Sequence, residues 1–188
     1  MKHNVNLNLL AKQVSFYCDP QRINDLDKEF LERLIALLRG MPVELKDSMY
    51  IGSAKRYTEE QEELYKKYRS GRGGLAAKPG TSMHEFGLAV DFRPKHGVSW
   101  NAPGTLFAKA MAWMYRYGPD HGIEGLSVIR NGEKSHDPRD PLHFQKMEDF
   151  VAKPVPEPEW SLSETIKKEQ AKYKRTWRDW LWSKIGYR

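Results

Sequence analysis

The segment Ser82–Asp91 places His84 and Asp91 seven residues apart, with Gly87 between them. In one continuous strand this odd separation would put the two side chains on opposite faces. In one continuous helix they would share a face, but about 10 Å of rise would separate them. The side chains can therefore meet only if the chain turns between them, and Gly87 is the residue that permits the turn. We expect a strand from Leu88 to Phe92 to follow and to carry Asp91.

A distant histidine, His143, would complete a metal site with His84 and Asp91. Zinc accepts histidine nitrogen and aspartate oxygen, and a catalytic zinc site uses three protein ligands and leaves one position open. Cys18 is the only cysteine, so an intrachain disulfide and a thiolate zinc cluster are both excluded. The sequence therefore predicts a zinc (Zn2+) site built from two histidines and one aspartate.

Hydrolysis at such a site also needs a general base and a positive charge near the reacting carbonyl. Asp140 stands three residues before His143 and is the candidate base. Arg56, just after an apolar strand, is the candidate cation. The alternative roles are a turn-shaping residue for Asp140 and a surface ion pair for Arg56. Glu85, next to a candidate ligand, is expected to be exposed.

Helical and strand-like segments alternate along the first 150 residues, which indicates an α+β fold with a small antiparallel sheet and flanking helices. Thr58 and Gln61 stand in the positions of a capping box. Asn131-Gly132 is a strong hairpin signal. The expected helices are Asp19–Gly40, one opening at Thr58, and Pro103–Gly118. The expected strands are Met49–Ala54, Leu88–Phe92, Leu126–Arg130 and Leu142–Gln145, with a loop at Gly71–Gly80.

The composition changes after residue 150. Residues 1–150 are expected to form the catalytic domain, residues 151–160 a proline-rich linker, and residues 161–188 a basic, tryptophan-rich helical tail. The tail's apolar and basic faces predict an amphipathic helix, which would dock on the domain, attach to an anionic envelope surface or bind another protein.

Charge and hydropathy limit the expected partners and cellular location of the chain. The net charge is +6, but no nucleic-acid-binding motif accompanies it, so we expect no nucleic-acid partner. No window approaches the roughly 18 to 20 apolar residues of a transmembrane segment. The first 20 residues lack the apolar core of a secretory signal, so we expect synthesis in a bacterial cytoplasm.

Two motifs resemble those of the LAS superfamily of zinc peptidases, named after lysostaphin, D-Ala-D-Ala peptidases and sonic hedgehog. They are Ser-x-His-x-x-Gly-x-Ala-x-Asp at residues 82–91 and Asp-x-x-His at residues 140–143. The family carries an arginine before its first motif and a glutamine five residues later, as Arg56 and Gln61 stand here. The run at residues 77–82 also resembles phage and Bacillus-type members. The similarity covers about residues 48–146.

The resemblance implies cleavage of peptide stems in bacterial peptidoglycan. It makes His84, Asp91 and His143 the zinc ligands, Asp140 the base, Arg56 the group that binds the substrate carbonyl, and Ser82 and Gln61 supporting residues. Aspartate at position 140 resembles L-alanyl-D-glutamate endopeptidases of the phage endolysin type, whereas carboxypeptidase members usually have glutamate there. The favoured function is such an endolysin, reaching the cell wall after release or from a virion. The alternatives are a D-alanyl-D-alanine carboxypeptidase and a non-catalytic zinc-containing binding module.

Overall fold

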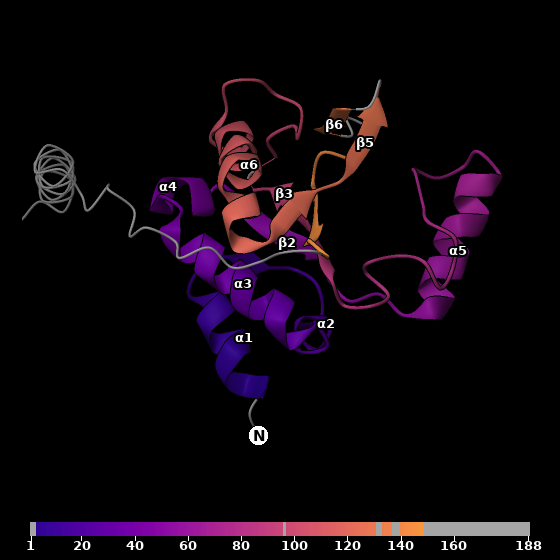
Figure 1. The fold of residues 1–188 in the computed structure, drawn as a ribbon, viewed down its shortest axis with the longest axis horizontal. Helices are drawn as coiled ribbons and strands as arrows, with labels where there is room; N and C mark the ends of the chain where they lie inside the picture. The colour runs from indigo at the N-terminus through magenta and orange to yellow at the C-terminus, as the bar shows by residue number, and fades with distance from the viewer. Residues whose placement is uncertain (1–2, 96, 131–132, 137–139, 149–188) are drawn as a thin grey trace, which may run out of the picture. The chain divides into compact units, whose positions relative to one another are not determined.

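A computed structural model describes residues 3–95, 97–130, 133–136 and 140–148, and the expected linker and helical tail lie outside these ranges. The helices are α1 (His3–Ala11), α2 (Pro20–Asn24), α3 (Lys28–Gly40), α4 (Val43–Lys46), α5 (Thr58–Arg69), α6 (Leu106–Tyr117) and the 3-10 turn η1 (Gly118–His121). The strands are β1 (Ser15–Phe16), β2 (Met49–Ser53), β3 (Ala89–Pro94), β4 (Ile123–Gly125), β5 (Ser127–Arg130), β6 (Glu133–His136) and β7 (His143–Lys146). The predicted α+β class is confirmed (Figure 1). No helix within the described ranges is long and apolar enough to cross a membrane.

The central sheet has five strands in the order β1-β2-β3-β7-β4. All neighbouring pairs are antiparallel except β1 and β2, which are parallel. Strands β1 and β4 were not predicted, because strands of two and three residues are too short to show a period. Strands β5 and β6 form a separate antiparallel hairpin in which Arg130 pairs with Glu133, as the intervening Asn-Gly dipeptide predicted.

The core lies against one face of the sheet. Val90, Phe92 and Phe144 are fully buried there, and the two phenylalanine rings meet edge to face at 5.8 Å. Helix α3 contributes Phe30 and Leu34, which have no exposed surface. Side chains alternate between the two faces of a strand, so the residues between these core positions point to the opposite face. That opposite face carries the candidate site.

The helix expected at Asp19–Gly40 is in fact two helices, α2 and α3. Asp19 caps α2 by accepting a hydrogen bond from the Gln21 backbone N–H, and Asp27 caps α3 by accepting one from Phe30. The apolar period continues across the break, so periodicity alone could not reveal it. Each capping aspartate satisfies one of the free N–H groups at its helix start, which stabilises the break.

Of the two other helix starts, one is as predicted and one differs. Helix α5 begins at Thr58 as predicted, but Tyr57 takes the cap position, without a side-chain hydrogen bond, in place of the expected Thr58 cap. The third helix begins at Leu106, three residues after Pro103, because Thr105 caps it through the Ala108 N–H. Helix α5 stands apart from the other helices in Figure 1 and contributes to one side of the site.

Candidate metal centre

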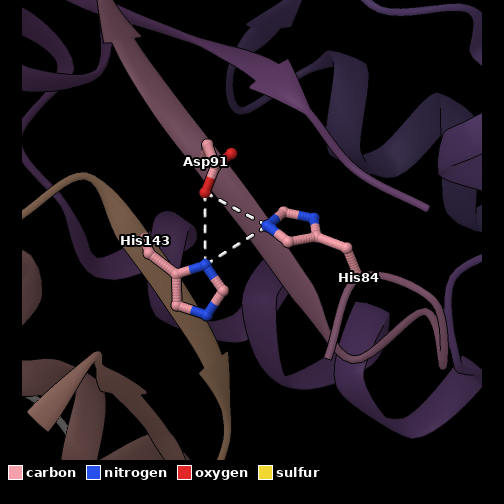
Figure 2. A group of neighbouring side chains, drawn as sticks. All are labelled: His84, Asp91 and His143. Atoms are coloured by element: carbon pink, nitrogen blue, oxygen red, sulfur yellow. Dashed lines mark hydrogen bonds and ion pairs between the residues drawn. The ribbon is translucent and has the colours of Figure 1, made fainter. Parts of the chain in front are cut away.

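Strands β3 and β7 bring Asp91 and His143 together. The two residues are directly paired across the antiparallel ladder, so their side chains project from the same face as neighbours. His84 approaches from the turn before β3, and Figure 2 shows the three side chains converging. Asp91 and His143, which are 52 positions apart in the chain, therefore meet because the sheet register places them opposite each other.

The predicted turn between His84 and Asp91 is confirmed, and Gly87 makes it. Its φ of 72° is left-handed, which a residue with a Cβ adopts only at a cost. The Gly87 N–H donates to the His84 carbonyl, and the Gly87 carbonyl accepts from the Asp27 N–H at 2.9 Å. A Cβ on Gly87 would lie 2.7 Å from the Asp25 carbonyl oxygen. The turn thus depends on glycine for both its conformation and its packing.

Three ligand-type atoms form a nearly equilateral triangle. His84 Nε2, His143 Nδ1 and Asp91 Oδ1 are each 3.2 Å from the other two. All three residues are at most 7% exposed. His84 Nδ1 lies 2.7 Å from the carbonyl oxygen of Ala54, which can only accept, so this nitrogen holds the proton. His143 Nε2 likewise donates to Gln145 Oε1 at 3.1 Å.

These outer hydrogen bonds leave three lone pairs facing one another. In neutral imidazoles, His84 Nε2 and His143 Nδ1 then carry no proton and point at the Asp91 carboxylate. Three acceptors in a buried site repel unless a cation lies among them. Four ligands about 2.0–2.1 Å from a tetrahedral metal would be about 3.3–3.4 Å apart, close to the spacing seen here. The donor set and its spacing fit a divalent transition metal.

The pKa shifts describe the same site without a metal. Burial alone would raise the pKa of Asp91, but hydrogen bonds with His143 and His84 lower it far below its ordinary range. Burial would lower the pKa of His143, but its contact with Asp91 raises it overall. A proton shared with the Asp91 carboxylate therefore takes the place that a cation would occupy, and proton and metal compete.

Arg56 lies beside this cluster and is held in place by Gln61. Its Nη1 donates to Gln61 Oε1 at 2.8 Å, its Nη2 donates to Ser53 Oγ at 3.3 Å, and its Nη2 is 3.9 Å from Asp91 Oδ2. Gln61 is fully buried and also donates from Nε2 to the Ala77 carbonyl at 2.7 Å. The predicted capping-box role for Gln61 is wrong, because its side chain turns toward the site instead of toward the helix start.

Asp140 borders the same cleft as His84, Asp91 and His143. It is half-buried, and its pKa is raised, first by burial and then by the negative charge of Asp91. A raised pKa makes a carboxylate a stronger proton acceptor than a free aspartate, which suits a general base beside the cluster of His84, Asp91 and His143, called the metal-type cluster below. This position is compatible with the expected general base.

Ser82 and Glu85 shape the turn that carries His84. Ser82 is buried at the cleft wall, and its backbone N–H donates to Glu85 Oε2 at 3.2 Å. The Gly80 N–H donates to the same carboxylate at 3.0 Å. The expectation that Glu85 is exposed is wrong, because these backbone donors satisfy its buried charge. No pattern in the sequence marked this role.

The cleft above the cluster has a volume of about 530 Å³. Helix α5 and the loop after it supply one wall, through Leu64, Lys67 and residues 73–77. Strand β3 supplies Arg93, which lies two residues after Asp91 and so on the same face of the sheet. With Arg56, three cationic side chains line a cleft whose floor carries the metal-type cluster.

Comparison with known proteins identifies a family for this arrangement. The sequence profile described as VanY, D-alanyl-D-alanine carboxypeptidase, matches residues 24–135, which is 112 of the 188 residues. The match includes Arg56, His84 and Asp91 and ends before Asp140 and His143. A comparison with curated protein sequences gives no significant match.

Solved structures of peptidases are also similar. The LD-carboxypeptidase LdcB has 17% identity and a TM-score of 0.49, over 71% of this chain and 65% of its own. A vancomycin resistance D,D-pentapeptidase VanY in complex with Zn(II) has 20% identity and a TM-score of 0.44, over 64% of this chain and 72% of its own. The L-Ala D-Glu endopeptidase ChiX of Serratia marcescens has 19% identity and a TM-score of 0.43, over 72% and 92%. The chain thus spans just under two thirds of the length of LdcB.

Proposed function

The chain belongs to the VanY family of D-alanyl-D-alanine carboxypeptidases, and from this premise we propose that it is a zinc-dependent hydrolase of peptidoglycan stem peptides. One observation carries the proposal: three buried lone pairs converge at 3.2 Å beside a carboxyl group with a raised pKa. A purely structural cluster would gain nothing from three converging acceptors unless a proton or a cation lies between them.

His84, Asp91 and His143 would hold the zinc ion, through Nε2, Oδ1 and Nδ1 respectively. The ion would supply Lewis-acid activation of water and of the scissile carbonyl. The Ala54 carbonyl and the Gln145 side chain fix the two imidazole tautomers, so the ligand nitrogens face the ion's position without rearrangement.

Asp140 and Arg56 would act on the substrate. Asp140 accepts the proton that the attacking water loses and can return it to the leaving amine. Arg56 places a positive charge on the other side of Asp91, where it stabilises the negative charge that develops on the carbonyl oxygen. Gln61 keeps the guanidinium in that position because it occupies one of its donor groups from a buried site.

For the bond that is cut, we propose the amide between L-alanine and D-glutamate. The support is the aspartate at position 140, where carboxypeptidase relatives usually carry glutamate. The family match favours a second candidate, removal of the terminal D-alanine. A non-catalytic zinc module is the third, and Asp140 at the cleft argues against it.

A muropeptide digest with and without a chelator tests these candidates. Mass spectrometry should show release of a stem that begins at D-glutamate, and this product should disappear when the metal is removed. Loss of a terminal alanine would instead identify the carboxypeptidase. If neither product forms although the metal is bound, the peptidase proposal fails and the binding module is favoured.

The biological setting is also a proposal. A phage endolysin made in the host cytoplasm and released to the wall, or carried on a virion, fits an enzyme that cuts stem peptides. The basic segment 161–188 would add attachment to an anionic envelope surface. Lysis of cells from within by the expressed chain together with a separate membrane-permeabilising protein would test the endolysin setting.

A further inference from the structure

A second cavity adjoins the catalytic cleft, and we call it the Trp100 pocket. Its volume is about 390 Å³. Two of its lining residues, Arg93 and Asp140, also line the cleft, so the two hollows meet at these side chains. The other walls are mostly apolar and comprise Pro94, Val98, Trp100, Pro141 and Leu142, with Ser99 beside them.

The Trp100 pocket exposes apolar surface that a folded chain ordinarily covers. The Trp100 side chain is 49% exposed and Val98 is 37% exposed, although both line a concave surface. Tryptophan combines a large flat apolar face with one polar N–H, so an exposed indole in a hollow is suited to a ligand with one apolar face and a polar rim. Concave sites with apolar walls and a few polar groups are the usual form of ligand sites.

We infer that the Trp100 pocket binds the muramic acid ring to which the stem peptide is attached. This inference rests on the proposed cleavage between L-alanine and D-glutamate. The C–H face of a pyranose ring would pack against the indole of Trp100. The ring hydroxyls and the acetamido group would reach the Arg93 guanidinium, which donates, and the Ser99 hydroxyl, which donates to Asn101 Oδ1 and can accept.

The length of the substrate agrees with this placement. Between the scissile carbonyl and the sugar lie only the alanine and the lactyl group, about two residue lengths or roughly 7 Å when extended. The pocket begins at Asp140, which also borders the metal-type cluster. When the scissile bond lies at the cluster, the sugar would therefore lie in the Trp100 pocket, and more distant parts of the stem would not.

The charges that line the cleft and the Trp100 pocket favour one orientation of the bound substrate. The sugar, the lactyl group and the alanine carry no charge, which suits the mostly apolar Trp100 pocket. The D-glutamate side carries a free carboxylate, which suits the part of the cleft lined by Arg56 and Lys67. The opposite orientation would place this carboxylate beside Asp140 and Arg93 instead of beside Arg56 and Lys67.

Two matched substrates test the inference: N-acetylmuramoyl-L-alanyl-D-isoglutamine and N-acetyl-L-alanyl-D-isoglutamine, which lacks the sugar. For the zinc-loaded full chain, kcat/KM should be about 10-fold higher for the muramoyl substrate, the scale of one aromatic stacking contact. In Trp100→Ala this ratio should fall toward one, and in Trp100→Phe it should be intermediate. Tyr17→Ala removes an exposed aromatic ring outside the pocket and should keep the ratio.

Product binding supplies a readout independent of turnover. N-acetylmuramoyl-L-alanine should bind the chain more tightly than N-acetyl-L-alanine in calorimetry, and Trp100→Ala should remove the difference. Equal values for the two substrates, or an equal loss on both in Trp100→Ala, would overturn the sugar site while leaving the peptidase intact. If neither substrate is cut but terminal D-alanine is released, the endopeptidase proposal fails and the sugar site fails with it.

Discussion

Gln61 Oε1 accepts a hydrogen bond from Arg56 Nη1 at 2.8 Å, and this contact joins helix α5 to the metal-type cluster. The other end of the same amide donates to the Ala77 carbonyl at 2.7 Å. Gln61 is fully buried, so both interactions are made without water. One side chain thus fixes the cation of the site and the loop that forms a wall of its cleft.

Replacing Gln61 with Leu should lower activity more than it lowers metal binding. The variant leaves the part-buried Arg56 guanidinium without one partner, at a cost of roughly 1–3 kcal/mol of stability, and frees the carbonyl of the exposed residue Ala77. A displaced Arg56 should reduce kcat/KM by about 10- to 100-fold, because small errors in position are costly in catalysis. Zinc stoichiometry should stay at one. The exposed neighbour Glu62, changed to Ala, is the control; equal rates in both variants would contradict the role of Gln61.

Prediction from the sequence succeeded where a local pattern encodes the geometry. The separation of His84 and Asp91 required a turn, and Gly87 supplies it. The strand expected at Leu88–Phe92 is β3, and it carries Asp91 as predicted. The chemistry of Asp91 and His143 predicted that they lie close together. It could not predict that they are paired directly across β3 and β7, because this register depends on contacts between segments far apart in the chain.

The missed features depend on partners distant in sequence or on single hydrogen bonds. Gln61 has the spacing of a capping box, yet its side chain bonds to Arg56 and to Ala77, sixteen residues away. Glutamate is usually exposed because it is charged, but the N–H groups of Gly80 and Ser82 donate hydrogen bonds to the Glu85 carboxylate. No helical or strand period records such contacts.

Removal of one metal ligand should abolish tight zinc binding. His84→Ala, Asp91→Ala and His143→Ala each remove one ligand atom from the 3.2 Å triangle. Gln145→Leu removes only the partner of His143 Nε2 and should weaken binding by about 10- to 100-fold, the usual effect of losing an outer hydrogen bond. The ligand variants should lose more than this. Competition with a chelating dye measures the zinc affinity of each variant. A ligand variant with wild-type affinity would show that the replaced residue is not a zinc ligand.

The variant Asp140→Ala should still bind zinc but should turn over substrate much more slowly. The loss of a general base lowers turnover by roughly 100-fold or more. Because Asp140 stands outside the 3.2 Å triangle, its removal should leave one zinc per chain, measured by elemental analysis. Loss of zinc would make Asp140 a ligand. A near-normal rate would mean that the base lies elsewhere.

As the pH is lowered, kcat/KM should begin to fall at a pH above that at which a free aspartate titrates. In the metal-free site, burial first and then the charge of Asp91 raise the pKa of Asp140, and a bound cation would offset the contribution of Asp91. Burial still makes the carboxyl keep its proton to a higher pH than a free aspartate. The base form is lost as pH falls through this raised pKa, and kcat/KM falls with it. Metal content must be measured at each pH, because protonation of His143 releases metal. An acid midpoint at the value of a free aspartate would contradict the assignment.

The last prediction compares two glycines that share a left-handed backbone but differ in their surroundings. Gly87 has φ +72° and Gly104 has φ +76°, so alanine at either position pays about 1–2 kcal/mol for the conformation. At Gly104 nothing lies within 4 Å of the new Cβ, whereas at Gly87 it would lie 2.7 Å from the Asp25 carbonyl and 3.1 Å from the Asp27 nitrogen. The backbone must therefore move at Gly87.

That movement should be transmitted to the metal site, because the Gly87 turn positions His84. Gly87→Ala should lower the free energy of unfolding by more than Gly104→Ala does, and it alone should weaken zinc binding, by about 10-fold or more. Denaturant unfolding and a zinc titration of both variants measure the two effects. Equal losses of stability, with zinc affinity unchanged in both, would show that the Asp25–Asp27 backbone moves aside and that the turn holds its histidine without that support.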